Sequence, residues 1–190
     1  MAYNIRRPTV NPGRLLSAFS HIGYNPVSAL LDIADNAVSA KATKIAISVD
    51  TESQKGAAGR PKAILKAFTI IDNGCGMDVE GLDNALSLGS SPQAYHEYTL
   101  SKFGLGLKSA AASIGMQLEI ITRPKSDLSR PFKAMLDFSK ITSDYYYELF
   151  DPTAEDIATL NSLTGGGAGN RIPPSLSRQR RGFRTGVAFS

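Results

Sequence analysis

The chain has 190 residues, 42% of them hydrophobic, which is typical of one globular domain with a substantial core. Its formal net charge is +4, but five of its 21 basic side chains follow Thr164 and all 17 acidic side chains precede it. The single cysteine, Cys75, excludes an internal disulfide framework and a cysteine-cluster zinc site. No apolar run approaches the roughly 18 residues of a membrane span and the N-terminus lacks a signal-peptide core, so we expect a cytoplasmic protein without membrane contact.

The clearest predicted helix runs from Asn25 to Ala40, with Asn25 as its cap and Pro26 at its first position. Asp32 and Asn36 are four residues apart and therefore neighbours on one polar face. A solvated face is the ordinary alternative, but short acids and amides are not the Lys and Glu that such faces favour. The apolar residues at spacings of three and four are expected to face the core: Val27, Leu30, Leu31, Ala34 and Val38.

Two strands are predicted next, over residues 44–50 and 63–71, with a loop over 51–62. The second strand ends in Asp72-Asn73-Gly74-Cys75-Gly76-Met77. Asp-Asn-Gly is a common hairpin turn, but the residues that follow predict a short helix from Asp78 to Leu86 rather than a returning strand. The acid and the two glycines therefore favour a strand end where a ligand approaches the backbone.

A long loop over 88–102 precedes Lys102-Phe103-Gly104-Leu105-Gly106-Leu107-Lys108, a glycine loop that opens a helix over 105–114. Free backbone N–H groups at a helix start form an anion site, and Lys108 would add a positive charge for phosphate. Leu107 separates Gly106 from Lys108, so this is not a Walker A loop; Ser109 stands where a Rossmann fingerprint has its third glycine. Strands follow near 117–122 and 132–138.

The texture changes at Thr164 to glycines, prolines and scattered arginines with little apolar periodicity. We therefore expect a domain over residues 1–163 and a basic, poorly ordered tail over 164–190.

Taken together, these motifs resemble the GHKL ATPases, which include gyrase B subunits, heat-shock chaperones, histidine-kinase catalytic domains, MutL and MORC proteins. The resemblance covers roughly Arg14 to Thr122 and is closest to MORC-like and bacterial MORC-related domains, through Asp-Asn-Gly-Cys-Gly-Met and Gly-Leu-Lys-Ser. It implies an α+β two-layer sandwich, the Bergerat ATP-binding fold, with a mixed sheet, helices on one face and an ATP lid over about 87–103.

The resemblance also implies residue roles. Asn36 would hold the magnesium ion that bridges the phosphates, and Asp72 would accept a hydrogen bond from the adenine amino group. Gly74 and Gly76 would let the nucleotide lie against the backbone, and Met77 would line the adenine pocket. Asp35 and Ala40 would support the helix motif. The phosphate loop would comprise Lys102, Phe103, Gly104, Leu105, Gly106, Leu107 and Lys108.

Two positions depart from the family pattern. Asp32 stands where gyrase-like members carry the glutamate that activates water, so this general base is shorter by about 1.5 Å of reach and turnover could be slow. The family's Gly-Thr strand, whose threonine helps to hold an adenine-bound water, has no convincing match. The nearest strings are Thr164-Gly165-Gly166 and Thr185-Gly186-Val187.

The sequence therefore predicts a magnesium-dependent ATP hydrolase module that belongs to a larger MORC-like machine, dimerises on binding ATP, and meets DNA or a larger protein through further C-terminal regions. One alternative is histidine-kinase-like phosphotransfer, which is disfavoured because no phosphoacceptor helix precedes the module. The other is a nucleotide-gated nucleic-acid-binding module that hydrolyses little and uses the basic tail.

Overall fold

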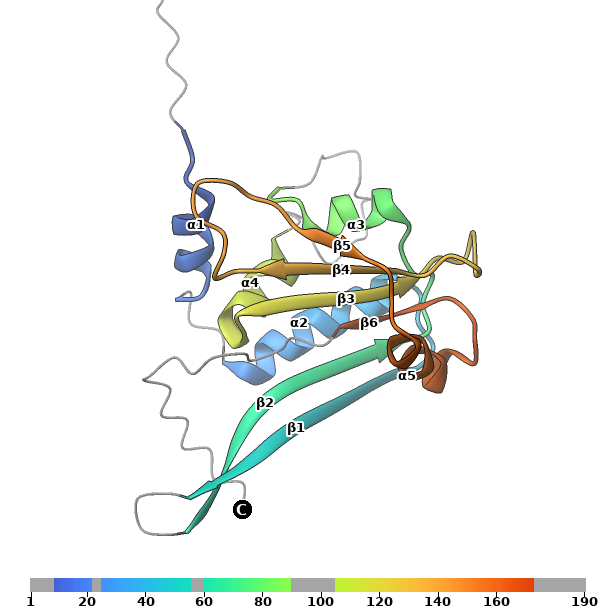
Figure 1. Ribbon diagram of the computed structural model, residues 1–190, viewed down its shortest axis with the longest axis horizontal. Helices are drawn as coiled ribbons and strands as arrows, with labels where there is room; N and C mark the ends of the chain where they lie inside the picture. Colours follow the sequence, from blue (N-terminus) through green and yellow to red (C-terminus); the bar gives the residue numbers. More distant parts are fainter. Residues whose placement is uncertain (1–8, 22–24, 56–59, 90–104, 173–190) are drawn as a thin grey trace, which may run out of the picture.

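The computed structural model describes residues 9–21, 25–55, 60–89 and 105–172 (Figure 1). The strands form a six-stranded sheet in the order β1-β2-β6-β3-β4-β5. The elements are α1 (Pro12–Phe19), α2 (Pro26–Ser39), β1 (Ile45–Lys55), β2 (Pro61–Asp72), α3 (Val79–Leu86), α4 (Gly106–Ile114), β3 (Gln117–Arg123), β4 (Phe132–Asp137), β5 (Glu148–Phe150), α5 (Ala154–Thr164) and β6 (Gly169–Ile172).

The predicted α+β class is confirmed, but the sheet is antiparallel at every described junction rather than mixed. The β1–β2 and β3–β4 pairs are hairpins, which are antiparallel by construction. The last strand, β6, enters between β2 and β3 and runs antiparallel to both. The helices α3 and α4 connect β2 to β3, but β6 lies between these two strands in the sheet, so they do not form a parallel pair.

The main core lies between one face of the sheet and the helices α1, α2 and α4. Ile70 and Ile120 face this layer, where they join Ile33 of α2 and Ala110 of α4. Strand side chains alternate between faces, so the neighbouring residues Ile71 and Ile121 point to the other side.

A single described helix, α5, covers that second face, which was expected to be bare. Leu160 of α5 packs against Ile71 and Ile121. Figure 1 shows α5 on the near side of the sheet and α2 behind it. The helices therefore occupy both faces, because β2 and β3 are apolar on both sides where they meet β6.

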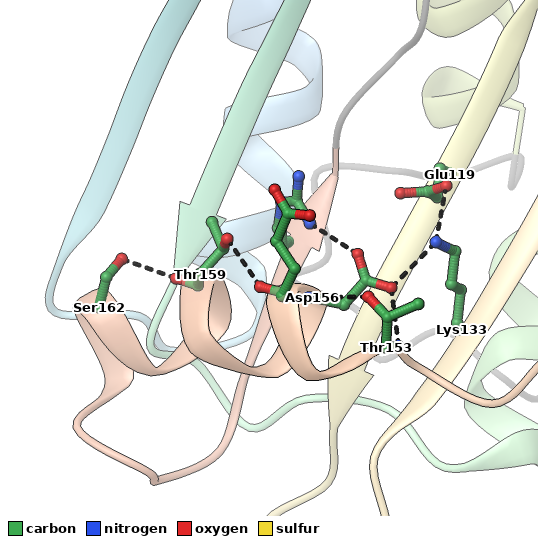
Figure 2. A network of polar contacts seen from close by, with 8 residues as sticks. Glu119, Lys133, Thr153, Asp156, Thr159 and Ser162 are labelled. Atoms are coloured by element: carbon green, nitrogen blue, oxygen red, sulfur yellow. Dashed lines mark hydrogen bonds and ion pairs between the residues drawn. The ribbon is translucent and has the colours of Figure 1, made fainter.

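A polar network also fixes α5 to the sheet (Figure 2). Asp156 accepts hydrogen bonds at 3.0 Å from the Lys133 ammonium group, from the Arg171 guanidinium group and from the backbone N–H of Thr153. Burial acts to raise the pKa of Asp156, but the bonds from Thr153 and Lys133 together lower it. Since Arg171 belongs to β6, this carboxylate holds the central strand and the outer helix together.

The buried face of α2 is only partly the predicted one, in which Leu30 does pack against the main core. Asn25 caps the helix as expected, through a bond from the Ser28 N–H. However, Val27, Leu31 and Val38 are 60%, 57% and 54% exposed. The buried side chains are instead Ala29, Ile33 and Ala37. The small residues Ala29 and Ala37 let α2 approach α4, whose Ala110 and Ala111 are fully buried.

Two further boundaries differ from expectation. Residues 51–55 and 61–62 belong to strands rather than to a loop, because the β1–β2 hairpin continues through a register shift after Asp50. Residues 164–172 are not a tail: α5 ends at Thr164 and β6 is paired on both sides. Within the described ranges, no helix combines the length and apolar character needed to cross a membrane.

Candidate functional site

The site begins at the end of β2, where Asp72 is only 3% exposed. Its Oδ1 accepts a hydrogen bond from the backbone N–H of Gly74 at 2.8 Å. A Cβ on Gly74 would lie 2.9 Å from that oxygen and 2.8 Å from the Cβ of Ala40 at the end of α2. Glycine is therefore required here by the close approach of α2 to the carboxylate.

The loop after Asp72 is anchored on two sides. It is not a hairpin turn, which confirms the prediction. The Cys75 N–H donates to the Ala40 carbonyl at 2.9 Å, and the Cys75 carbonyl accepts from the Lys125 N–H at 2.8 Å. Asn73 Oδ1 accepts from the backbone N–H groups of Thr43 and Lys44. The loop thus bridges the end of α2 and the end of β3.

The backbone at position 76 accepts only glycine. Its φ is +64°, in the left-handed region, and a Cβ would lie 1.9 Å from the carbonyl oxygen of Arg123. Met77 follows with a partly buried side chain that packs against the main core. Protein packing alone accounts for both glycines, so a ligand contact at Gly74 or Gly76 stays a prediction.

A chain of hydrogen bonds leads from this loop to Asp72. The Met77 N–H donates to Thr122 Oγ1 at 2.7 Å, and that hydroxyl donates to Asn170 Oδ1 at 2.7 Å. Asn170 Nδ2 then donates to both carboxylate oxygens of Asp72, at 3.3 and 3.2 Å. Each donor has a defined acceptor, so the side-chain orientations of Thr122 and Asn170 are determined by their neighbours.

Asn170 and Thr122 are the site residues that sequence reasoning missed. Asn170 lies directly opposite Asp72 in the β2–β6 register and opposite Thr122 in the β3–β6 register. The two Thr-Gly strings nearest to the family pattern, at Thr164 and Thr185, lie on either side of the Gly169-Asn170 pair. The available signal was a glycine followed by Asn170, two residues before Ile172, but it lay in a segment expected to be poorly ordered.

The environment of Asp72 disfavours its charge. Burial raises the pKa of this carboxyl group, and the hydrogen bonds from Gly74 and Asn170 offset only part of that effect. A buried carboxylate with incomplete compensation is stabilised by any additional hydrogen-bond donor that reaches it.

The second part of the site is the polar face of α2. Asp32 and Asn36 are both half-buried. Asn36 Nδ2 donates back to the carbonyls of Asp32 at 2.9 Å and Ile33 at 3.3 Å. With the amide nitrogen turned toward its own helix, the amide oxygen is directed away from these two bonds. Asn36 also lies one turn before Ala40, so the anchored loop brings this face close to the β2 end.

The protein ligands near Asn36 suit a hard cation that is bound mainly by phosphate oxygens and water. Among the residues that the structure describes, no group of three or more His, Cys, Asp or Glu could hold a metal ion. Magnesium characteristically takes few protein ligands and keeps phosphate oxygens and waters. One outward amide oxygen on Asn36 fits that mode.

The third part is the start of α4, which is only partly described. Lys102, Phe103 and Gly104 lie outside the described residues, whereas Gly106 begins the helix and Leu105 precedes it without a side-chain cap. The Leu107 side chain is buried in the core, so only its backbone is available to a ligand. The uncapped N–H groups of this first turn are suited to an anion.

Lys108 was expected to direct its ammonium group to phosphate, but the structure directs it elsewhere. The residue is 1% exposed, and its Nζ donates to the carbonyl of Ala85 at 2.6 Å. Burial lowers its pKa to about 8. The Tyr145 hydroxyl donates to the adjacent carbonyl of Leu86. Lys108 and Tyr145 therefore cap the C-terminal end of α3, where the segment expected to be the lid begins.

A comparison with protein families agrees with this geometry. The family model described as "Histidine kinase-, DNA gyrase B-, and HSP90-like ATPase" matches residues 24–169, well over half of the chain. The match runs from the start of α2 to the first residue of β6. It therefore includes Asp32, Asn36, the Asp72 loop and the start of α4.

Proposed function

The chain belongs to the histidine kinase-, DNA gyrase B- and HSP90-like ATPase family, and we propose that its ATP-binding domain binds ATP with magnesium and hydrolyses it. The observation that carries this proposal is the buried Asp72 carboxylate at the end of β2, held by Gly74 and Asn170. The nucleotide would lie between this loop and the polar face of α2.

The adenine amino group is the donor that Asp72 lacks. A neutral N–H donor that enters from the helix layer would complete the hydrogen bonding of a carboxylate whose charge is poorly solvated. Gly74 and Gly76 would let the base approach the backbone, and Met77 would pack against it. The Asn170–Thr122 pair would keep the carboxylate in position.

The phosphates would extend toward α2 and the start of α4. Asn36 would hold a magnesium ion through its amide oxygen, and this ion would neutralise charge that develops on the phosphate oxygens. The backbone N–H groups of Gly106 and Leu107, together with Lys102, Phe103, Gly104 and Leu105, would surround the terminal phosphate. Lys108 would contribute positive potential from its buried position rather than through direct contact.

Asp32 is the proposed general base. Its carboxylate would accept a proton from a water molecule that attacks the γ-phosphorus in line with the leaving oxygen. It lies one helical turn before Asn36, so both side chains would face the same phosphate group. Since aspartate has a shorter reach than glutamate, we expect slow turnover.

The wider setting is also a proposal. The similarity of the Asp72 and Lys108 motifs to MORC-like proteins supports a module of a larger machine that dimerises on binding ATP and acts on DNA or a large protein. The exposed free thiol of Cys75 supports a reducing, cytoplasmic compartment.

Phosphate release from ATP, measured with magnesium and again with excess EDTA, tests the activity. We expect turnover only with magnesium. With γ-labelled ATP, label released as phosphate supports hydrolysis, whereas label retained on the protein would support the histidine-kinase alternative. A complete lack of nucleotide binding would refute the proposal.

Salt-dependent retention on DNA tests the nucleic-acid alternative. The appropriate deletion removes residues 173–190, because a deletion from residue 164 would also remove β6. Retention that disappears with this deletion, in a protein that does not hydrolyse ATP, would favour the nucleotide-gated binding module.

A further inference from the structure

The first strand of the sheet, β1, is an edge strand over its whole length. It pairs with β2 on one side and has no described strand on the other (Figure 1). Every residue of β1 is exposed except Gln54, which is half-buried. An edge strand of 11 residues offers a row of N–H and C=O groups to another chain.

The direction of these groups follows from one contact. The Asn73 N–H donates to the Lys44 carbonyl at 3.2 Å, in the register that β1 and β2 then continue. Backbone groups alternate along an antiparallel strand. Lys44, Ser48 and Asp50 therefore direct their backbone groups toward β2, and Ile45, Ile47 and Val49 direct theirs outward.

The same three residues expose apolar side chains. Ile45, Ile47 and Val49 are 37%, 48% and 51% exposed. Ile47 lies opposite Ile70 and Val49 lies opposite Phe68, so their side chains are on the face of the sheet that α1, α2 and α4 cover. Natural edge strands are protected by proline, by lysine or by a bulge. None of these devices interrupts the segment 45–49.

We infer that β1 pairs antiparallel with β1 of a second copy of this chain, with a two-fold axis through Ile47. In this register Ile47 meets its own copy, and Ile45 meets Val49 of the other copy. These are the residues whose backbone groups point outward, so each pair would exchange two hydrogen bonds. The interface is isologous, as closed two-fold dimers require.

Charge complementarity supports this register and identifies the occupant as a second copy. Lys44 of one copy lies opposite Asp50 of the other, on the face of the sheet that α5 covers. Within the described part of the chain, neither Lys44 nor Asp50 forms an ion pair. One short segment thus supplies apolar pairs on one face and two opposite-charge pairs on the other. Cross-strand pairs of both kinds stabilise antiparallel sheets.

The pairing would form a twelve-stranded sheet across two copies and is independent of ATP. Its test is the association of the full chain without nucleotide, by sedimentation velocity over a range of concentrations. Ile47→Lys places a charge on the axis and should raise the dissociation constant at least about tenfold. Leu149→Lys is the matched control, because Leu149 is 49% exposed on β5 at the opposite edge. It should change the constant less than about twofold.

A charge exchange tests the register. Lys44→Glu places two acids opposite each other and should weaken association, and Asp50→Lys should do the same with two bases. The double variant restores opposite charges and should recover the affinity of the unmodified chain. If each single substitution weakens association and the double variant does not recover it, this register is refuted.

Cross-linking adds a geometric test in a Cys75→Ser background. Directly opposite residues in a hydrogen-bonded pair lie about 5.5 Å apart, so Ile47→Cys should form a disulfide-linked dimer on mild oxidation. Ser53→Cys would lie about 40 Å from its own copy and should remain monomeric. Equal cross-linking of both variants would overturn the proposal.

The failure of this inference is separate from failure of the proposed function. A chain that is monomeric at every concentration without nucleotide would overturn the edge pairing and leave ATP hydrolysis untouched. Association that appears only with ATP would equally overturn it, because β1 is exposed without nucleotide.

Discussion

Asn170 donates to both carboxylate oxygens of Asp72, although the two residues are separated by 98 positions in the chain. The contact exists because β6 enters the sheet beside β2 and brings the two residues directly opposite each other. On the far side of β6, the Asp156–Arg171 pair fixes the next residue of the same strand to α5. The adenine-binding carboxylate that we propose is therefore positioned by the last described strand of the chain.

Substitution of Asn170 should separate a hydrogen-bonding role from a packing role. Asn170→Thr keeps a side-chain donor near Asp72 and should bind ATP within about threefold of the unmodified chain. Asn170→Val removes the donor and should weaken ATP binding about tenfold or more, because it leaves a buried carboxylate with one bond fewer. Isothermal titration calorimetry measures both. Equal affinity of the two variants would show that the Asn170 amide does not support the nucleotide.

Asp32 should affect turnover and not affinity. Asp32→Asn removes the proposed base and should lower the rate of phosphate release about a hundredfold or more, with ATP affinity nearly unchanged. Asp32→Glu restores the longer reach and should raise the rate. The control is Glu155→Gln, an exposed acid on α5 at the other face of the sheet, which should leave the rate unchanged. A fully active Asp32→Asn protein would exclude Asp32 as the base.

The buried Asp72 should lower stability at neutral pH. Its folded-state pKa lies above the ordinary value of 3.8 because of burial, so its contribution to stability is full below that value and is lost as the pH rises through the folded pKa. Asp72→Asn should therefore raise the free energy of unfolding at pH 7 while abolishing ATP binding. Urea unfolding between pH 4 and 7 should show this gain shrinking as the pH falls.

Asp137 provides the opposite case as a control. Burial acts to raise its pKa, but the hydrogen bonds from Ser139 and Gln117 outweigh that effect and lower it. Its contribution is therefore present at neutral pH and is lost as the pH falls through the folded pKa. Asp137→Asn should destabilise the protein at pH 7. If the change in the free energy of unfolding varied with pH in the same way for the Asp72 and Asp137 variants, both pKa directions would be contradicted.

Lys108 should produce a stability change at alkaline pH. Its pKa of about 8 lies below the ordinary 10.5, so the folded protein releases this proton first and stability should increase between these two values. The increase should be roughly 3 kcal/mol. Lys108→Met should lack the increase, whereas Lys125→Met, at an exposed position, should retain it. Denaturant unfolding from pH 7 to 10.5 measures the difference, and identical profiles would contradict the burial of the amine.

Local patterns in the sequence were sufficient for much of the fold. Asn25 and Asp78 cap the helices that they were expected to begin, because a cap depends only on residues within one turn. The segment after Asp72 was predicted not to be a hairpin turn, and a helix, α3, does follow it. The roles of Asp32, Asn36 and Gly106 follow from the resemblance to the family, whose model spans their positions, and they stay predictions.

The tertiary structure decided what depends on distant neighbours. Val27, Leu31 and Val38, which were predicted to face the core, proved to be exposed because α2 packs through its small residues Ala29 and Ala37. The ammonium group of Lys108 lies at the end of α3 because that carbonyl is its buried partner. Asn170 could not be assigned before β6 was placed beside β2. Caps and turns are set by short-range hydrogen bonds, whereas burial and cross-strand pairing are set by which segments meet, and sequence separation hides that information.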